Sequence, residues 1–473
     1  MSDKAPDLIQ EKRNRKKSKT SMVHIADSIR YYDQLLEKYE PSLVDIFASF
    51  TKECETKKLT FGGRAMYNFL RPNFISIEQY GYIKHVCSVL RNAITKFKES
   101  ALANPHIMSQ AGIVAKEKEL VDIHPGYDRL SITARWDSFL DKNSLKFVEL
   151  NAECPAGIAY SDVAAGVYAN LPFIKDFKKK YTVAEFQIRQ TLLDGLLETY
   201  AIYRGNKRSN KPTIAIVDWR EVPTYTEFQL FQEFFESEGF ECIIADPRDL
   251  TYDENVLRCG DVAIDLVYKR ILTNDCVNRV EETKALVDAY RDHNVCIINS
   301  FRAKIIHKKS IFAVLTHEMN NEMFTAEELG VISKHIPWTR TIRDETTLFR
   351  GTKINLLEYV SENKDDFVIK PNDEYGGKGV SLGKESTQEH WNKIIEEARD
   401  GEYFVVQEMV PIPRVPFPII DGARMRYADM VVDMDPYVFG AKVEGVLTRL
   451  SSSSLANVTA GGGTTPTFVL SEK

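Results

Sequence analysis

The sequence predicts an α+β protein built from several packed units, one of which is a small parallel α/β sheet. The chain has 473 residues, more than one ordinary hydrophobic core accommodates, so two to three units are expected. Between Lys211 and Phe301, buried strand patterns such as TIAIVDW and ECIIADP alternate with helical patterns, which is typical of parallel sheets. Elsewhere the order differs: helical patterns come first, and neighbouring strand patterns follow as hairpins.

Composition and charge exclude several classes of protein. The formal net charge of −6 argues against a protein built around nucleic acid. No apolar run approaches the roughly 20 residues that a membrane helix requires, and the N-terminus lacks the apolar core of a secretory signal. The seven cysteines are scattered and form no CxxC pair, which is typical of reduced thiols. We therefore expect a cytoplasmic protein that binds neither nucleic acid nor membranes.

The N-terminal part is expected to be a basic tail followed by helices. Lysines and arginines crowd positions 12–19, as in a solvated tail, with a docking arm for an acidic partner as the alternative. Helical patterns follow in SIRYYDQLLEKY and IEQYGYIKHVCSVLRNAITKF. Within the α/β stretch, TYTE (Thr224 to Glu227) has the pattern of a capping box that opens a helix ending at Gly239.

The segment FVIKPNDEYGGKGVSLG contains the clearest signal for chemistry. FVIK and GVSLG have strand patterns, so the glycines between them are expected in a hairpin loop. Backbone N–H groups of such a loop form a concavity for anions, and glycine lets them approach a phosphate closely. The alternative is a flexible hairpin with solvated lysines. The candidate phosphate-binding residues are Lys370, Gly376, Gly377, Lys378 and Gly379.

A second signal is a predicted hairpin with polar residues at matching positions. In RWDSFLDKNSLKFVELNAECPAG, Arg135 and Asp137 share one face of the first strand, and Glu149 and Asn151 share one face of the second. If the connection has an odd number of residues, for example 142–144, Asp137 lies opposite Glu149, whereas an even connection separates them. Two carboxylates and an amide oxygen suit Mg²⁺, and Arg135 beside them suits the charge of a transferring phosphoryl group. The alternative is the polar outer face of an ordinary hairpin.

A third, weaker signal is YFVVQEMVP, an apolar strand interrupted by Gln407 and Glu408 before a proline. Such a strand can present its backbone to an adenine edge, with the carboxylate near N6 or the ribose. An ordinary buried strand is the alternative.

Together these segments resemble the ATP-grasp superfamily, specifically its circularly permuted branch. In ATP-grasp enzymes such as D-alanine–D-alanine ligase, the lysine strand and glycine loop come first, the adenine strand follows, and the Arg-x-Asp and ExNxxPG-like strands come last. Here RWDSFL and VELNAECPAG precede VIKPNDEYGGKG and VVQEMV by more than two hundred positions. The tail EGVLTRLSSSSLANVTAGGGTTP resembles the Arg and Asn-x-x-x-Gly-Gly region that normally precedes the metal strands. Glutathionylspermidine synthase-like, ATP-dependent carboxylate-amine ligases are the functional relatives that the resemblance indicates.

The resemblance implies a circularly permuted ATP-grasp fold with an α/β pre-ATP-grasp (Rossmann-like) domain and N-terminal helices. The implied divisions are a basic flexible tail (1–22), an N-terminal helical region (23–120), metal-binding strands of the C-terminal subdomain (121–170), a helical connection (171–210), the pre-ATP-grasp domain (211–304), the nucleotide-binding subdomain (305–415) and the remainder of the C-terminal subdomain (416–473).

The resemblance also implies roles for the residues at the motif positions. Lys370 contacts ATP phosphate and adenine, and Lys309 or its neighbour Lys308 is the other nucleotide lysine. The glycine loop forms a mobile phosphate flap. One departure from the family pattern is Ala156, which stands between the proline and the glycine of ECPAG in the turn on the substrate side.

The remaining implied roles concern metal, adenine and catalysis. The implied Mg²⁺ ligands are Asp137, Glu149 and Asn151. The implied adenine edge consists of Gln407, Glu408 and Val410. Arg135 is placed at the γ-phosphate or acyl-phosphate, and Arg449 and Asn457 at phosphate or substrate, so that the implied catalytic residues are Arg135, Lys370 and Arg449.

Such a site implies an ADP-forming ligase that uses ATP and Mg²⁺. A substrate carboxylate attacks the γ-phosphorus to give an acyl-phosphate, and an amine, or less often a thiol, displaces phosphate. The expected partners are a small-molecule or peptide carboxylate and an amine or thiol nucleophile, with Glu221 and Tyr225 as possible substrate neighbours. Two alternatives remain open: a phosphotransferase with the same cradle, and a non-catalytic nucleotide-binding or maturation partner. The sequence leaves the oligomeric state open.

Overall fold

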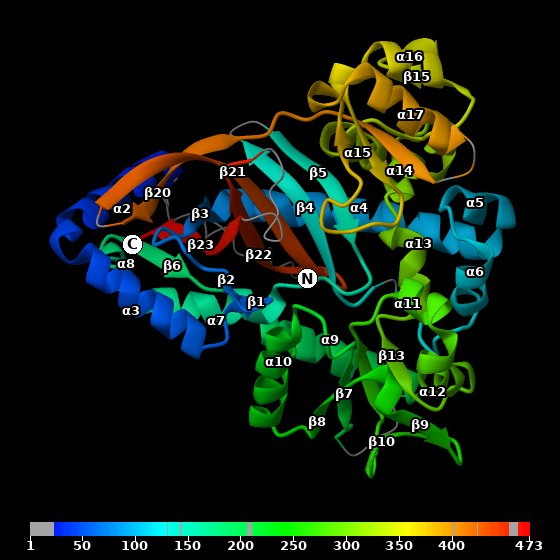
Figure 1. Cartoon of the computed structure of the whole chain (residues 1–473), viewed down its shortest axis with the longest axis horizontal. Helices are drawn as coiled ribbons and strands as arrows, with labels where there is room; N and C mark the ends of the chain where they lie inside the picture. Colours follow the sequence, from blue (N-terminus) through cyan, green and yellow to red (C-terminus); the bar gives the residue numbers. More distant parts are fainter. Residues whose placement is uncertain are drawn as a thin grey trace, which may run out of the picture.

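The computed structural model (Figure 1) describes residues 23–129, 131–141, 144–205, 211–399, 401, 403–422, 424–453 and 462–473. The predicted basic tail, 1–22, and Asn457 lie outside these ranges. None of the described helices combines the length and the apolar character that crossing a bilayer requires.

The largest part of the fold is an eight-stranded sheet assembled from both halves of the chain. Its strands are β3 (Asn73–Ser76), β4 (Ala134–Asp141), β5 (Ser144–Asn151), β6 (Tyr181–Ala184), β20 (Arg414–Asp421), β21 (Arg424–Phe439), β22 (Lys442–Ser451) and β23 (Gly463–Glu472). The central path runs β3-β23-β22-β21-β4-β5, with β20 paired to β21 and β6 to β23. The C-terminal strands therefore lie directly beside the β4–β5 hairpin, the neighbourhood that a permuted chain order requires.

Helices from the first half of the chain pack around this sheet, and the long α4 runs behind it in Figure 1. They are α2 (Ile25–Lys38), α3 (Leu43–Thr56), α4 (Ile77–Ala103), α7 (Ile158–Ala169), α8 (Pro172–Phe177) and α9 (Ile188–Tyr203). Two further helices, α5 (Pro105–Gln110) and α6 (Ala115–Val121), lie away from the sheet at the right of Figure 1, and Leu120 of α6 belongs to the hydrophobic core of the α/β unit. Ser76 and Gln79 form a capping box at the start of α4, which fixes where that helix begins.

The two stretches predicted as helical also contain short strands, which is a correction to the sequence analysis. The 23–120 region holds β1 (Thr60–Phe61), β2 (Arg64–Ala65) and β3, and the 171–210 region holds β6. β3 and β6 pair with β23, near the C-terminus. Periodicity within two to four residues cannot reveal such strands, because their partners lie hundreds of positions away.

The predicted α/β unit is present below the large sheet in Figure 1. Its four parallel strands run in the order β13 (Cys296–Ile298), β12 (Leu266–Lys269), β7 (Ile214–Val217) and β8 (Cys242–Ala245). The accompanying elements are α10 (Tyr225–Ser237), α11 (Thr273–Asn278), α12 (Val280–Arg291), β9 (Leu250–Asp253), β10 (Val256–Cys259) and β11 (Val262–Ala263). The unit has its own hydrophobic core, which includes Val217, Val267 and Ile297.

The capping box predicted for α10 does not form. Thr224 is the residue before the helix, but its side chain makes no capping hydrogen bond. Glu227 instead accepts hydrogen bonds from the backbone N–H groups of Gly157 (2.8 Å) and Ala159 (3.1 Å) at the start of α7. Glu227 therefore contacts the start of α7, in another part of the fold, and does not cap its own helix.

The unit that carries the glycine loop contains a sheet of order β14 (Thr339–Thr341), β19 (Phe404–Glu408), β17 (Phe367–Pro371) and β18 (Ser381–Leu382). The other elements of this part are α13 (Lys304–His307), α14 (Ser310–Thr316), α15 (Ala326–His335), α16 (Leu356–Glu362), α17 (Gln388–Arg399), β15 (Thr346–Phe349) and β16 (Thr352–Asn355). Trp391 and Phe367 are fully buried in its own core.

Candidate active site

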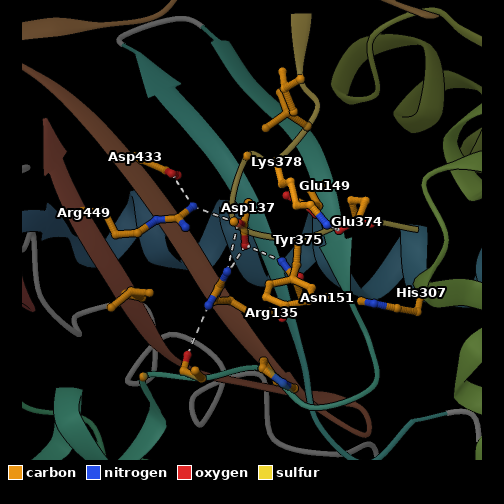
Figure 2. Close-up of a pocket in the computed structure, with 18 of the residues that line it drawn as sticks. Arg135, Asp137, Glu149, Asn151, His307, Glu374, Tyr375, Lys378, Asp433 and Arg449 are labelled. Atoms are coloured by element: carbon orange, nitrogen blue, oxygen red, sulfur yellow. Dashed lines mark hydrogen bonds and ion pairs between the residues drawn. The ribbon is translucent and has the colours of Figure 1, made fainter. Parts of the chain in front are cut away.

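A cavity of about 540 Å³ lies where the large sheet, the α/β unit and the glycine-loop unit meet. Figure 2 shows part of its wall: Arg135, Asp137 and Asn151 project from the β4–β5 hairpin, and Tyr375 and Lys378 approach from the loop that follows β17. The cavity therefore gathers the segments in which the sequence carries its chemical signals.

The β4–β5 hairpin places the predicted polar residues opposite one another. Asp137 pairs with Glu149, and Arg135 pairs with Asn151. All four side chains line the cavity. The predicted register of the two strands is confirmed at these positions.

The reason for this register differs from the one expected. Asp141 pairs with Ser144, which leaves two positions between the strands, so the expectation of an odd connection is wrong. A β-bulge directly after Asp137 restores the register, with Val148 as the extra residue of β5. The Val148 carbonyl accepts a hydrogen bond from Lys370 Nζ at 3.0 Å, so the bulge also anchors that lysine.

Asp137 is the centre of a buried cluster of ion pairs. Arg135 donates to it from Nε at 2.7 Å and from Nη2 at 3.0 Å, and Arg449 of β22 donates from Nη2 at 2.8 Å (Figure 2). Burial raises the pKa of Asp137, but the two guanidinium groups outweigh burial and hold that pKa at about 2. Asp137 is therefore ionised at neutral pH.

Two aspartates of β21 belong to the same cluster and were missed by the sequence analysis. Asp433 and Asp435 both form ion pairs with Arg449, the latter at 3.0 Å. Burial raises the pKa of both carboxyl groups. Asp433 Oδ1 and Asp435 Oδ2 have no hydrogen-bond partner among the described residues. Their spacing of two on one strand face is the signal that could have found them.

Two lysines face the second carboxylate. Lys309 Nζ lies 2.9 Å from Glu149 Oε1, and Lys370 Nζ donates to Gln407 Oε1 at 2.7 Å. Burial lowers the pKa of Lys370 to about 8, and the charge of Lys309 acts in the same direction. Burial raises the pKa of Glu149, but the charge of Lys309 more than offsets this, so the net shift is downward.

Lys308, the other candidate for the second nucleotide lysine, lies outside the cavity. Its Nζ donates to the Gly112 carbonyl at 2.8 Å and pairs with Glu117 at 2.7 Å. The geometry therefore favours Lys309 over Lys308 as a ligand-facing lysine.

The predicted glycine hairpin is present, with Val368 of β17 opposite Leu382 of β18. Gly376 and Gly377 line the cavity with φ of 66° and 75°, a backbone conformation that side chains disfavour. Gly379 does not line the cavity, but a Cβ there would lie 2.6 Å from Pro371 Cγ. Lys378 lines the cavity, with its Nζ 3.2 Å from Glu374 Oε1.

The strand predicted at the adenine edge, β19, lies beside β17. Gln407, Glu408 and Val410 all line the cavity. The Gln407 side chain is already engaged, because it accepts from Lys370 and donates to Thr339 Oγ1 at 3.0 Å. Apolar side chains line the same part: Phe139, Val148, Val368, Leu382, Met409 and Ile412. Apolar walls with a few polar groups at the edge suit a flat heterocycle.

The residues predicted to hold Mg²⁺ fit that ion in their chemistry. Asp137 and Glu149 face each other in register, and charges around them favour their ionised forms. Asn151, whose Nδ2 donates to Asp137 Oδ1 at 3.1 Å, adds an amide group. Within the described ranges no three His, Cys, Asp or Glu side chains come together as a metal centre. Nucleotide phosphates and water would supply the remaining ligands, as is usual for Mg²⁺.

Comparison with known proteins agrees with this geometry. The model of the family "circularly permuted ATP-grasp type 2" matches residues 140–451, more than half of the chain. The chain belongs to this family. The fold class predicted from the sequence, α+β with a circularly permuted ATP-grasp order, is thereby confirmed.

Solved structures are similar to this ATP-grasp protein at low sequence identity, and the first of those that follow shares its fold. A glutathione synthetase-like effector from Globodera pallida, in apo form, is 13% identical and has a TM-score of 0.60, covering 90% of this chain and 97% of its own. A candidate gamma-glutamylcysteine synthetase from Methylobacillus flagellatus is 13% identical, with a TM-score of 0.39 and coverage of 77% and 83%. D-alanyl-alanine synthetase A from Vibrio cholerae is 12% identical, with a TM-score of 0.27 and coverage of 48% and 68%. No curated protein sequence matches the chain.

In this ATP-grasp protein the cavity also reaches the α/β unit, where the residues that line it were not predicted from the sequence. Asp218, Trp219 and Arg270 line it, whereas Glu221 and Tyr225 do not. Glu221 instead pairs with Arg248 at 2.7 Å. Ligands bind at the carboxyl ends of parallel strands, so the residues that directly follow TIAIV and LVYK are the substrate-site candidates that this rule would have indicated.

Proposed function

We propose that this ATP-grasp protein is an ATP- and Mg²⁺-dependent ligase that joins a carboxylate to an amine, or to a thiol, through an acyl-phosphate. One observation carries the proposal: a single cavity holds the facing carboxylates of Asp137 and Glu149, surrounded by cationic side chains and approached by the glycine loop. The cationic side chains are Arg135, Lys309, Lys370, Lys378 and Arg449. This set is suited to the charge of a transferring phosphoryl group.

The nucleotide would lie between the two sheets. Its adenine would meet the backbone after Glu408 and the apolar wall, and its phosphates would lie under Gly376 and Gly377, near Lys309 and Lys370. Asp137, Glu149 and Asn151 would hold Mg²⁺, which when bound neutralises phosphate charge.

The chain's own groups account for the two steps by orientation and charge. A substrate carboxylate oxygen would attack the γ-phosphorus, and ADP would leave with the electron pair of the broken P–O bond. Arg135 and Arg449 would then stabilise the acyl-phosphate. The amine would attack the acyl carbon, phosphate would leave, and the amine proton would pass to phosphate or water. His307 lines the cavity, but burial lowers its pKa to about 4, so it is neutral at pH 7 and is not needed as an acid.

We infer further that the substrates are of the glutathionylspermidine or glutathione type, and that the protein acts in the cytoplasm. The sequence motifs support the first point, together with the fold shared with the glutathione synthetase-like effector. The cysteines, all free in the described structure, support the second.

The test is calorimetric titration of ADP and of a non-hydrolysable ATP analogue, with and without Mg²⁺. The wild type is compared with Glu149→Gln and with Asp141→Asn, which removes a carboxylate from the exposed end of β4. We expect Mg²⁺-dependent binding that weakens about tenfold or more in Glu149→Gln, because a charge-assisted contact is lost. Asp141→Asn should bind like the wild type.

Absence of nucleotide binding by the folded protein would refute the ligase proposal. Binding with ATP consumption and a stable phosphorylated product would identify a phosphotransferase instead. Nucleotide binding without turnover on any acid and amine pair would indicate a maturation partner.

A further inference from the structure

The cavity has a second chemical centre at the switch point of the α/β sheet. The chain leaves β7 to form β8 on one side and returns to form β12 on the other side, so β7 and β12 flank the point where the strand order reverses. Open α/β sheets bind ligands at the carboxyl ends of the strands at such a point. Asp218 and Trp219 follow β7, and Arg270 follows β12, and all three line the cavity.

Two carboxylates at this centre, Asp218 and Asp275, lie more than 4 Å from the cationic groups of the described residues. Asp218 accepts one hydrogen bond, from the backbone N–H of Trp219 at 2.9 Å. Neither Asp218 nor Asp275, which also lines the cavity, forms an ion pair with any side chain in the described ranges. Burial raises the pKa of Asp218 to about 6, and the charges of Arg270 and Lys269, which form no ion pair with it, offset only part of that rise. A positively charged group of a ligand would stabilise both ionised carboxylates.

Arg270 offers the complementary group. Its side chain is only 4% exposed, and Nη1 donates to the Pro155 carbonyl at 2.7 Å. Nη2 donates to Glu227 at 3.4 Å, while Nε has no partner among the described residues. A buried donor without an acceptor destabilises the protein, so an acceptor supplied by a ligand is favoured.

Glu227 explains why the guanidinium is held in this position. It is buried, it accepts the two N–H groups at the start of α7, and it pairs with Arg270. It therefore fixes Arg270 against the ATP-grasp part of the chain and is a positioning residue.

We propose that this end of the cavity binds the α-ammonium and α-carboxylate of an amino-acid unit in one of the two substrates, with Asp218 and Asp275 on the ammonium and Arg270 Nε on the carboxylate. Lys269 of β12 pairs with Val217 of β7, so Arg270 and Asp218 each directly follow one paired position and flank the same point at the end of the sheet. The reacting group of the same substrate points along the cavity toward Arg135. This inference rests on the proposed ligase function, because only a ligase would use the bound amino-acid unit as a substrate. Binding of the amino acid can be measured whether or not the protein is a ligase.

The test is a thermal-shift and calorimetric screen of the common α-amino acids against the full-length protein, with and without ADP and Mg²⁺. For each amino acid that binds, the N-acetyl derivative and the carboxamide are titrated as well. We expect at least one amino acid to bind, and both derivatives to bind about tenfold more weakly or worse, because each lacks one of the two charges.

The variants are Asp218→Asn and Asp275→Asn, with Glu221→Gln as the matched control, since that carboxylate also follows β7 but lies outside the cavity. We expect Asp218→Asn and Asp275→Asn to bind the amino acid about tenfold more weakly than the wild type, and Glu221→Gln to bind it with unchanged affinity. ADP affinity should be unchanged in all three variants. Arg270→Lys, which keeps the charge but loses Nε, should weaken the carboxamide less than the free acid.

The inference is overturned if no amino acid binds to protein that binds ADP, if the derivatives bind as well as the parent, or if Asp218→Asn and Asp275→Asn have no effect. If ADP fails to bind while an amino acid binds and responds to these variants, the ligase proposal fails and the amino-acid site stands.

Discussion

Lys370 illustrates how burial adjusts a single charge in the cavity wall. It sits between the Val148 carbonyl and Gln407, and burial lowers its pKa to about 8. In the ligand-free protein it is therefore protonated below about pH 8 and increasingly neutral above that pH. A phosphate contact that depends on this charge must weaken as the pH rises through that value.

We expect ADP affinity in the presence of Mg²⁺ to be nearly constant from about pH 6.5 to 7.5 and to fall by up to about tenfold per pH unit above pH 8. Calorimetric titration across this range measures it. The arginine of the Lys370→Arg variant keeps its positive charge over this whole pH range, so the ADP affinity of this variant should not fall above pH 8. The same decline in Lys370→Arg as in the wild type would contradict the assignment.

At the scale of elements, the glycine loop between β17 and β18 joins backbone conformation to ligand contact. Gly377 has φ of 75° and lines the cavity. Gly260, in the turn between β10 and β11, has φ of 57° with nothing within 4 Å of an added Cβ, and it lies outside the cavity. The two positions therefore share the left-handed backbone conformation and differ in whether they line the cavity.

Alanine at either position should cost about 1 kcal/mol of unfolding free energy, because the left-handed conformation disfavours a Cβ. Only Gly377→Ala should also weaken ADP binding, by several-fold, since it changes the loop that faces the cavity. Urea unfolding and ADP titration of both variants check this. Equal ADP affinities in the two variants would show that the loop does not contact the nucleotide.

At the scale of the whole molecule, one buried network joins the large sheet, the α/β unit and the glycine-loop unit. Glu153, just after β5, is fully buried and lies 3.5 Å from Lys269 of β12 and 3.2 Å from Lys304 of α13. Lys304 also pairs with Asp373, beyond β17, at 2.6 Å. Burial raises the pKa of Glu153, but the two lysines outweigh it and hold that pKa well below its usual range.

We expect Glu153→Gln to lower the free energy of unfolding by about 3 kcal/mol at pH 7, because it leaves the buried Lys269 without an ion-pair partner among the described residues and removes one of the carboxylates around Lys304. Glu185→Gln, which breaks a half-exposed pair with Lys178, should cost less than about 1 kcal/mol. Because the folded-state pKa of Glu153 is depressed, its contribution is present above about pH 4.5 and is lost as the pH falls further. The difference in unfolding free energy between the wild type and Glu153→Gln should therefore become smaller at acidic pH, as measured by denaturant unfolding. A small difference in unfolding free energy at pH 7 would mean that the network does not hold the units together.

Much of the fold and part of the site geometry could be predicted from local pattern. Strand periodicity of two places Arg135 and Asp137 on one face, and glycines between two strand patterns predict the hairpin that carries Gly376 and Gly377. The parallel unit also follows from its alternating strands and helices. These features depend on residues a few positions apart, which the sequence displays directly.

By itself, then, the sequence determined the lysine strand with its glycine loop, the face of the β4–β5 hairpin that carries the polar residues, and the permuted order of the motifs. Only the tertiary structure decided that Lys309 rather than Lys308 faces the cavity, and that a bulge at Val148 brings Asp137 and Glu149 together. The same holds for Arg449, which pairs with aspartates of both β4 and β21, and for Arg270 at the switch point of the parallel sheet. Their partners lie far away in the sequence, so the choice among equally plausible charged residues rests on how distant segments pack, and no local pattern carries that information.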